Sequence, residues 1–259
     1  MRTSFRVACA VANTVLLAVV AGCSHHSQTA YTPPPPAIPA TPAPAPVPVT
    51  PPAASDHAIP PQPTLQPDSD QAIVASHAPI HSEQGMASWY GPPYNTRRGA
   101  NGQIYDQNAV SAAHRTLPMG SLIRVTNLET GQSAIMRITD RGPFVPDRVI
   151  DLSVGAAKAV GVWRPGTARV RIDVYVAPRP IDQGGRWCVQ VGAFLSAGNA
   201  KKLEEHLERK YQTANVIEFT GPTGHWVRIK PENGDKGRAV ELANEIKPKE
   251  GEAYLVRLD

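Results

Sequence analysis

Three polar, glycine-bearing loops in the middle of the chain carry the side chains best suited to acid–base or hydrogen-bonding chemistry. They hold Gln103, His114 and Asp140, in the runs Asn101-Gly102-Gln103, Ala113-His114-Arg115 and Asp140-Arg141-Gly142-Pro143. Asp140 follows an apolar strand end, and the Gly-Pro loop after it would lift its carboxyl group into a cleft. A carboxyl group placed there could act as a general acid or base. The alternative interpretation is that Asp140 only caps a turn.

The segments between these loops alternate apolar and polar residues, which is typical of half-buried strands. We expect strands at residues 86–91, 122–126, 133–139 and 169–176, and a helix at residues 154–160 with Ser153 as its N-cap. Asp106 is expected to cap another short helix that runs through residues 108–113. This layout predicts a small β-barrel domain over residues 85–178, with a site built on its loops.

Residues 1–22 have the pattern of a secretory signal peptide. Arg2 and Arg6 precede an apolar run, residues 7–20, that is too short to span a membrane. The run ends in Val20-Ala21-Gly22-Cys23, which resembles the bacterial lipobox, where the cysteine is acylated and becomes the mature N-terminus. An ordinary signal peptide before a chance cysteine is the alternative. Because Ser24 is not the aspartate typical of inner-membrane retention, the resemblance implies a lipid anchor at Cys23 in the outer membrane, facing the periplasm.

Residues 23–84 are expected to form a disordered tether. Of the 27 prolines in the chain, 15 lie between Tyr31 and Pro67, and aromatic residues are almost absent there. Such a segment cannot bury enough apolar surface to offset its ordering entropy. Its proline content favours extended conformations of about 3.1 Å per residue, which would hold the folded domains away from a membrane.

The charged residues and the cysteines limit the classes of function. Residues 81–180 hold twelve basic and seven acidic side chains, so the formal net charge of +4 is concentrated there. The basic residues are scattered, and together with the export signal this disfavours nucleic-acid binding. Of three cysteines only Cys188 lies in a folded region, where we expect it to be buried. No spacing typical of a metal site occurs, and we expect neither a metal nor another cofactor.

Six short motifs in the central region carry a resemblance to a known family. They are Ala87-Ser88-Trp89-Tyr90-Gly91, Asn101-Gly102-Gln103-Ile104-Tyr105-Asp106, Ala112-Ala113-His114-Arg115-Thr116-Leu117-Pro118, Val125-Thr126-Asn127-Leu128, Asp140-Arg141-Gly142-Pro143-Phe144 and Asp151-Leu152-Ser153. In type and order these motifs resemble the rare lipoprotein A family. The resemblance implies a six-stranded double-psi β-barrel. It also implies the activity of an endolytic peptidoglycan transglycosylase, which is a lyase.

The resemblance implies roles for individual residues. Asp140 would be the catalytic carboxyl group, protonating the glycosidic oxygen between N-acetylmuramic acid and N-acetylglucosamine. The muramyl 6-hydroxyl then attacks its own anomeric carbon and leaves a 1,6-anhydro end, so one carboxyl group can serve as acid and then as base, where a hydrolase normally uses two. His114 would bind a sugar hydroxyl or orient a carboxylate, or would be only a structural histidine. Trp89 and Tyr90 would offer rings for sugar stacking, although one of them is expected in the core.

Gln103 departs from the family pattern, because many members have a glutamate at this position. Glutamine is nearly isosteric with glutamate but cannot ionise or transfer a proton. If the glutamate is essential, this chain is a non-catalytic peptidoglycan-binding lipoprotein. If Asp140 suffices alone, the reaction survives at a lower rate. A third interpretation is an expansin-like barrel that loosens wall polymers without cleaving them. We assign Asp106 and Asp151 to capping and turn formation.

Residues 185–259 are expected to form a second small domain in which strands and helices follow a βαββαβ order, typical of a ferredoxin-like sandwich. Val189-Gln190-Val191-Gly192-Ala193-Phe194 and Trp226-Val227-Arg228-Ile229 resemble the SPOR (sporulation-related) module, which binds septal peptidoglycan strands that lack stem peptides. The resemblance implies that Gln190 contacts glycan, and an ordinary exposed strand residue is the alternative. It also implies enrichment at the division septum, with glycan strands as the partner and divisome proteins as further candidates.

Overall fold

The computed structural model describes residues 67–212, 215–221, 224–249 and 251–259, and all of these belong to one compact unit. The predicted signal peptide, Cys23 and most of the predicted tether lie outside the described residues. No helix in the described ranges is long and apolar enough to cross a membrane. The first part of the chain contains α1 (Pro67–Ser76), β1 (His81–Tyr90), β2 (Ser111–His114), β3 (Leu122–Asn127), β4 (Ser133–Asp140), β5 (Arg148–Ser153), α2 (Val154–Ala159) and β6 (Ala168–Val176).

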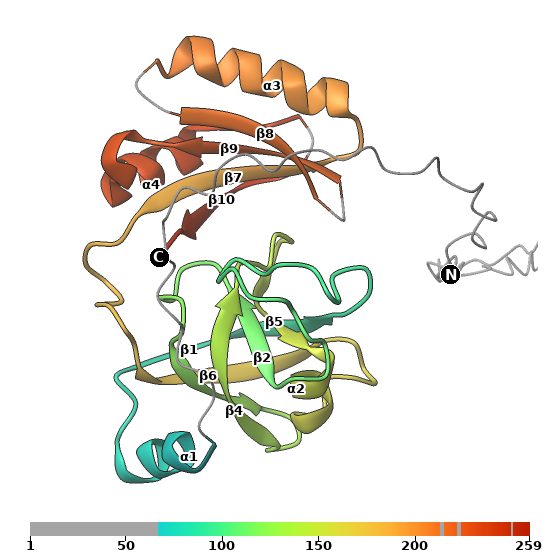
Figure 1. Ribbon diagram of the computed structural model, residues 1–259, viewed down its shortest axis with the longest axis vertical. Coiled ribbons are helices and arrows are strands. Elements are labelled where there is room, and N and C mark those ends of the chain that lie inside the picture. Colours follow the sequence, from blue (N-terminus) through green and yellow to red (C-terminus); the bar gives the residue numbers. More distant parts are fainter. Residues whose placement is uncertain (1–66, 213–214, 222–223, 250) are drawn as a thin grey trace, which may run out of the picture. The chain divides into compact units, whose positions relative to one another are not determined.

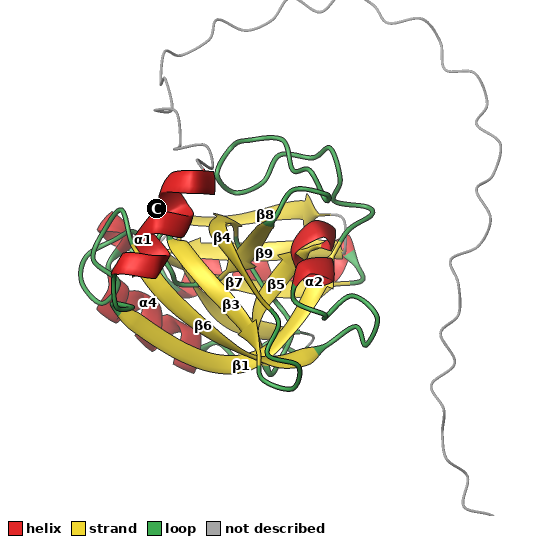
Figure 2. Ribbon diagram, turned by 90° about the horizontal axis from the view of Figure 1, so that it is seen from below, coloured by secondary structure: helices red, strands yellow, loops and turns green. Residues whose placement is uncertain are grey.

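Six strands form a closed barrel in the order β1-β5-β2-β4-β3-β6, with β6 paired back to β1 (Figures 1 and 2). Two of the pairs, β1 with β5 and β2 with β4, are parallel, and the others are antiparallel. Closure leaves no free sheet edge among these strands, so every strand satisfies its backbone groups on both sides. The six-stranded barrel predicted from the sequence is confirmed.

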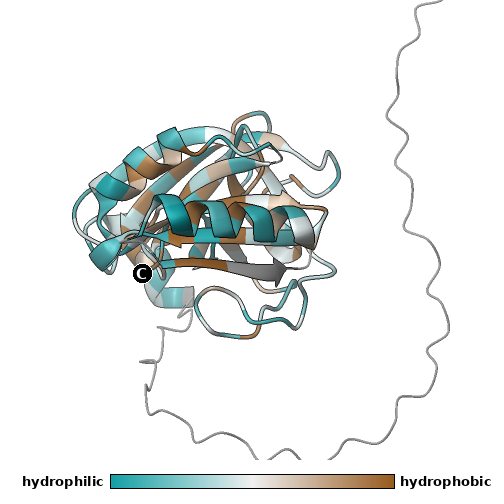
Figure 3. Ribbon diagram, turned by 90° about the horizontal axis from the view of Figure 1, so that it is seen from above, coloured by the Kyte–Doolittle hydropathy of each residue, from teal (hydrophilic) through white to brown (hydrophobic). Residues whose placement is uncertain are grey.

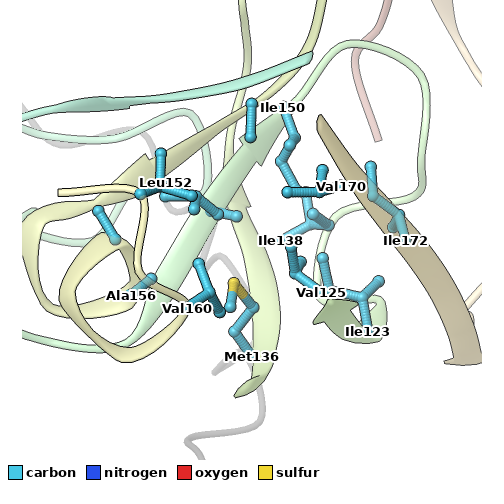
Figure 4. Close-up of a cluster of buried hydrophobic side chains, with 14 of the residues drawn as sticks. Ile123, Val125, Met136, Ile138, Ile150, Leu152, Ala156, Val160, Val170 and Ile172 are labelled. Carbon is cyan, nitrogen blue, oxygen red and sulfur yellow. The ribbon is translucent and has the colours of Figure 1, made fainter. Parts of the chain in front are cut away.

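The barrel is filled by side chains from alternate positions of its strands, as the two-residue period of a strand requires. Figure 4 shows these side chains pointing toward one another. Fully buried members are Ile123, Val125, Met136, Ile138, Ile150, Leu152, Val170 and Ile172. Burying one such side chain contributes about 1.5–3 kcal/mol to folding. The interior is therefore a packed core, and any binding site must lie on the outer face or on the loops.

The folded part of the chain begins earlier than the sequence predicted, because α1 and the first half of β1 lie within the predicted tether. Residues His81 to Gly85 pair with β6, and their side chains alternate between half-buried and exposed. Asp70 of α1 is 3% exposed and forms a two-pronged ion pair with Arg137 of β4, at 2.5 Å from Nη2 to Oδ1 and 3.2 Å from Nε to Oδ2. This segment is held by backbone pairing and one ion pair, so its sequence contains few apolar residues that would indicate folded structure. The predicted start of the barrel domain, at residue 85, is therefore too late.

The helix predicted through residues 108–113 is wrong. Asp106 does accept a hydrogen bond from the backbone N–H of Asn108, but the chain then turns and enters strand β2 at Ser111. All four residues of β2 are buried between β4 and β5. Tertiary pairing therefore overrides the capping signal. The other capping prediction is confirmed, since Ser153 Oγ accepts from the backbone N–H of Ala156 at the start of α2.

The second domain is a four-stranded antiparallel sheet in the order β10-β7-β9-β8, with two helices. Its elements are β7 (Trp187–Phe194), α3 (Ala197–Lys210), β8 (Asn215–Gly221), β9 (Gly224–Lys230), η1 (Glu232–Gly234), α4 (Lys236–Glu245) and β10 (Glu252–Arg257). The βαββαβ order and the ferredoxin-like sheet predicted from the sequence are confirmed.

Both long helices of the second domain pack on one face of its sheet. Leu207 of α3 and Leu242 of α4 join a single buried cluster with Val189, Val227 and Ile229 of the strands. The outer side of the helix nearest the viewer in Figure 3 is largely hydrophilic in colour. This is the amphipathic pattern of a helix that covers a sheet. The other face of the sheet keeps polar residues such as Gln190 and Arg228.

Candidate functional site

An irregular pairing between β2 and β4 determines which way Asp140 points. Ala112 pairs with Ile138, but the next residue, Ala113, pairs with Asp140 because Thr139 is the extra residue of a β-bulge. Ile138 points into the core and is fully buried. Without the bulge, regular alternation would turn Asp140 inward as well. The bulge instead brings Asp140 beside Ala113, on the outer face of the barrel, which is how bulges often re-aim a functional side chain.

One oxygen of the Asp140 carboxyl group is held by the backbone. Oδ1 accepts hydrogen bonds from the N–H of Ala100 at 2.9 Å and of Arg141 at 2.8 Å. Within the described part of the chain, Oδ2 receives no hydrogen bond. Burial raises the pKa of Asp140, and the two backbone hydrogen bonds only partly oppose this rise. A carboxyl group fixed through one oxygen, with its protonated form favoured, is suited to donate a proton from the other.

Arg141 does not pair with Asp140, although the two are neighbours in sequence. Its guanidinium group donates to the carbonyl oxygens of His114 at 3.0 Å and Leu117 at 2.7 Å. The positive charge of Arg141 is the weakest of the influences on the Asp140 pKa, after burial and the two backbone hydrogen bonds. Arg141 therefore braces the loop after β2, and the pKa of Asp140 remains raised despite its charge.

A cavity of about 740 Å³ opens beside Asp140. This volume lies within the usual range for small-ligand and sugar sites. Its barrel lining includes aromatic, basic and acidic side chains: Tyr90, Tyr94, Arg97, Arg98, Ala113, Asp140, Arg141, Phe144, Arg148 and Asp151. Gln190, Ala193, Trp226 and Arg228 of the second domain line it as well. Aromatic rings beside forked cationic donors suit a polar, hydroxyl-rich ligand such as a glycan.

The two aromatic residues at the end of β1 face different environments, as strand alternation requires. Trp89 packs against Trp163, with ring centroids 4.2 Å apart, and belongs to the edge of the barrel core. Tyr90 lines the cavity and stacks on Tyr105 at 4.5 Å, with Tyr94 edge-on at 5.8 Å. Burial and the nearby Asp140 charge raise the pKa of Tyr90, which keeps its hydroxyl neutral. Tyr90 is thus the member of the pair that lines the cavity.

His114 lies under the site rather than in the lining of the cavity. It is 4% exposed, and its Nδ1 accepts hydrogen bonds from the backbone N–H groups of Leu117 at 3.0 Å and Thr116 at 3.2 Å. An Nδ1 that accepts both bonds leaves the ring proton on Nε2, which lies 3.1 Å from Oε1 of Glu83. Burial would raise the pKa of Glu83, but the contact with His114 outweighs it and the pKa is lowered. Both ring nitrogens of His114 are occupied by protein groups.

Gln103 sits on an exposed loop and is not among the residues that line the cavity. Its Oε1 accepts from Nδ2 of Asn101 at 3.1 Å, and its carbonyl oxygen accepts from the N–H of Gly99. This loop nevertheless contacts the site, because Ala100 donates to Asp140. Gln190 is 4% exposed, accepts from Arg228 at 2.8 Å and lines the cavity. The structure therefore brings Asp140, Tyr90 and Gln190 to one cavity, and leaves Gln103, His114 and Trp89 outside its lining.

Asp151 is a cavity residue that the sequence reasoning assigned to turn formation. It lies in the middle of β5, where Ser88 Oγ donates to its Oδ1 at 2.7 Å and Arg148 Nη2 lies 3.4 Å from its Oδ2. Burial raises the pKa of Asp151, against the influence of Arg148 and Ser88. One signal was present in the sequence: Asp151 alternates with Ile150 and Leu152, which places it on the outer face of the barrel.

The comparisons with known proteins agree with this architecture. Residues 82–172 match the family model described as lytic transglycolase, a double-psi β-barrel family, and residues 183–257 match the SPOR domain. The chain therefore carries a barrel that matches the lytic transglycolase model, followed by a domain that matches the SPOR model. It is similar to the RlpA proteins, the rare lipoprotein A family that the sequence motifs resemble.

Three curated relatives illustrate the similarity. The endolytic peptidoglycan transglycosylase RlpA of Pasteurella multocida is 33% identical over 189 residues, covering 71% of this chain and 62% of the relative. Its namesake from Vibrio cholerae is 38% identical over 149 residues, covering 55% and 57%. The probable endolytic peptidoglycan transglycosylase RlpA of Synechocystis is 57% identical over 90 residues, covering 35% and 28%. The chain thus spans less than two thirds of the length of each of these relatives.

Proposed function

We propose that this protein is an endolytic lytic transglycosylase of peptidoglycan, with Asp140 as its catalytic acid and base. The observation that carries the proposal is the state of the Asp140 carboxyl group. One oxygen is anchored by two backbone N–H groups, the pKa is raised by burial, and the group lines a cavity with Tyr90 and several arginines. The similarity to relatives named as endolytic peptidoglycan transglycosylases supports the substrate class.

In the proposed reaction, protonated Asp140 donates its proton from Oδ2 to the glycosidic oxygen between N-acetylmuramic acid and N-acetylglucosamine. The bond from the muramyl anomeric carbon to that oxygen breaks, and the electron pair leaves with the oxygen. The muramyl 6-hydroxyl attacks the anomeric carbon, and its proton returns to the Asp140 carboxylate. The products are a 1,6-anhydro end and a free N-acetylglucosamine end, with Asp140 restored. General acid–base help of this kind contributes about 10²–10⁴-fold to a rate.

The SPOR domain supports a more specific substrate, namely glycan strands without stem peptides, as found at the division septum. The lipobox-like Val20-Ala21-Gly22-Cys23 supports acylation at Cys23 and attachment to the outer membrane, facing the periplasm. Both are parts of the proposal. They would place the barrel within reach of the septal wall, with the proline-rich segment as a spacer.

The test is to incubate the purified protein with sacculi and to identify the soluble products by mass spectrometry. We expect anhydro-ended glycans from the wild type and none from Asp140→Asn, which keeps the Oδ1 hydrogen bonds but cannot donate the proton. Asp147→Asn is a matched control, because Asp147 is exposed and does not line the cavity. Cleavage that is unaffected by Asp140→Asn would overturn the assignment of the acid.

A second candidate is a peptidoglycan-binding protein without activity, and the observation that favours it is the neutral side chain of Gln103. This candidate predicts that the wild type pellets with sacculi and releases no soluble product, at any protein concentration. The same digestion therefore separates the two candidates. Increased extensibility of sacculi without new chain ends would instead indicate an expansin-like barrel.

A further inference from the structure

Two carboxyl groups flank one small residue on the outer face of the barrel. Ala113 of β2 pairs with Asp140 of β4 on one side and with Asp151 of β5 on the other. All three residues line the same cavity. Directly paired residues of neighbouring strands point to the same face of a sheet, so the two carboxyl groups stand on either side of the Ala113 methyl group.

The spacing follows from the sheet. Neighbouring strands lie about 4.8 Å apart, so the backbones of Asp140 and Asp151 are separated by about 10 Å. The β-bulge at Thr139 is what makes the pair possible, because it turns Asp140 to the outer face that Asp151 occupies by ordinary alternation. The side chain between them is a single methyl group. Ala113 is 4% exposed and lines the cavity together with both carboxyl groups.

Both oxygens of the Asp151 carboxyl group have partners in the sheet, and the contact with Oδ2 is the longer one. Ser88 Oγ donates to Oδ1 at 2.7 Å, and Arg148 Nη1 donates to the same Ser88 oxygen at 2.6 Å. Arg148 Nη2 reaches Oδ2 only at 3.4 Å. Gly142 lies beside Oδ2, because a β-carbon at this glycine would be 3.9 Å from that oxygen. The charged groups that face Asp151 are Arg148 of its own strand and Arg115 after β2.

We propose that Asp151 is the second carboxyl group of the cleavage site and that it stabilises the positive charge that develops at the anomeric carbon. This inference rests on the proposed function. When Asp140 protonates the leaving oxygen, the sugar ring gains oxocarbenium character, and a fixed negative charge across the cavity lowers the energy of that state. In this role Asp151 acts as a carboxylate and forms no bond, so the atoms and electrons of the reaction are unchanged.

The proposal also explains how the site works without an ionisable side chain at position 103. Gln103 is exposed, bound to Asn101 and absent from the lining of the cavity. Asp151 lines the cavity from a rigid strand. The competing explanation is that Asp151 only positions Arg148 within the sheet. The two explanations predict different effects of the neutral, isosteric variant Asp151→Asn on the cleavage rate and on the stability of the protein.

The experiment compares Asp151→Asn, Asp140→Asn and the exposed control Asp147→Asn in the full-length protein, with purified glycan strands as substrate. We expect Asp151→Asn to lower kcat by about 10²–10³-fold, which is the usual effect of removing one preorganised electrostatic group. Binding of glycan strands and the Tm should change no more than in Asp147→Asn. Because the active form has Asp151 ionised and Asp140 protonated, the rate of the wild type should depend on both titrations, whereas the rate of Asp151→Asn should depend on that of Asp140 alone.

Several results would overturn the proposal. It is wrong if Asp151→Asn cleaves at the wild-type rate, or if its loss of rate follows a loss of Tm or of glycan binding. If the wild type itself produces no anhydro ends, the proposed function fails and this inference with it. If the wild type cleaves and Asp140→Asn does not, only the role of Asp151 is in question. If Asp151→Asn does not fold, Ser88→Ala can be used instead, because it keeps the charge of Asp151 but removes the hydrogen bond to Oδ1. We expect Ser88→Ala to lower kcat without raising KM. An unchanged kcat in Ser88→Ala would refute the proposal.

Discussion

The backbone N–H of Ala100 donates a 2.9 Å hydrogen bond to Oδ1 of Asp140, across 40 residues of sequence. A second contact, from the N–H of Asn101 to the carbonyl oxygen of Thr139 at 3.3 Å, runs beside it. The loop that carries Gln103 is thereby fixed to the strand end that carries Asp140. These contacts join the two motifs, and the side chain of Gln103 takes no part in them.

The pH dependence of cleavage should report the raised pKa of Asp140. A general acid works in its protonated form, so the rate should fall as the pH rises through the Asp140 pKa. Because burial raises that pKa above the usual 3.8, the fall should begin at a higher pH than for a free aspartate. The measurement is kcat/KM for anhydro-product formation against pH. A falling limb centred at or below the ordinary aspartate value would contradict it.

The raised pKa of Asp140 should also make the stability of the protein depend on pH. A carboxyl group whose pKa is raised by folding binds protons more tightly in the folded state, so its contribution is fully present at low pH and is lost as the pH rises through the folded pKa. Asp140→Asn removes this loss of stability at higher pH, because asparagine does not ionise. Its side-chain oxygen can still accept the hydrogen bonds from the N–H groups of Ala100 and Arg141. We expect the Tm of the variant, relative to the wild type, to increase between acidic and neutral pH. A difference that stays constant over this range would show that Asp140 is not destabilised by burial.

Gln103→Glu should change activity little. Gln103 is exposed, and its side chain is bound to Asn101 outside the lining of the cavity. An exposed charge contributes about 0–1 kcal/mol, so kcat/KM should change by less than about fivefold. The measurement is the rate of anhydro-product formation, with Glu129→Gln as a charge-change control on another exposed loop. A large gain of activity in Gln103→Glu would show that this loop closes over the substrate and that a carboxylate at position 103 is needed.

Replacing His114 should lower the free energy of unfolding more than it lowers the cleavage activity. His114→Ala leaves the N–H groups of half-buried Thr116 and buried Leu117 without their acceptor, and one buried unsatisfied group costs about 1–3 kcal/mol. His114→Asn places an oxygen near the position of Nδ1 and should recover part of this loss. Urea unfolding measures both variants. If His114 binds substrate directly, His114→Asn would instead lose activity while keeping the wild-type stability.

The extent to which the sequence predicted this structure depends on whether each feature is local. The N-cap Ser153, the alternating strands and the two-helix second domain are encoded within short windows, and these predictions are confirmed. Strand β2 was missed because its four residues, buried on both sides, show no alternation and follow a capping aspartate. The start of β1 was missed because polar residues there pair only through their backbone.

The site shows the same division. Asp140 was identified from its motif, but its outward direction depends on a bulge that involves Ala113 of another strand, which no local pattern reveals. One of the two ring nitrogens of His114, Nε2, lies beside Glu83, a residue within the segment predicted to be a tether. The sequence motifs assigned Asp151 to capping and turn formation. Its place in the cavity follows only from pairing with β2.

The ion pair between Asp70 and Arg137 should determine whether α1 stays on the barrel. Both side chains are largely buried, with 4% and 14% of their surfaces exposed, and Arg137 also donates to the carbonyl oxygen of Gly120 at 3.0 Å. Removing one partner of a buried pair leaves an uncompensated charge, and this typically costs about 3–5 kcal/mol. We expect Asp70→Ala to lower the free energy of unfolding by that order. Asp68→Ala, at an exposed position of the same helix, should have little effect.

Urea denaturation followed by tryptophan fluorescence measures both variants. Equal, small losses in the two would show that α1 contributes nothing to the stability of the barrel, whereas partial recovery in the double variant Asp70→Leu with Arg137→Met would identify the unpaired charge as the cause.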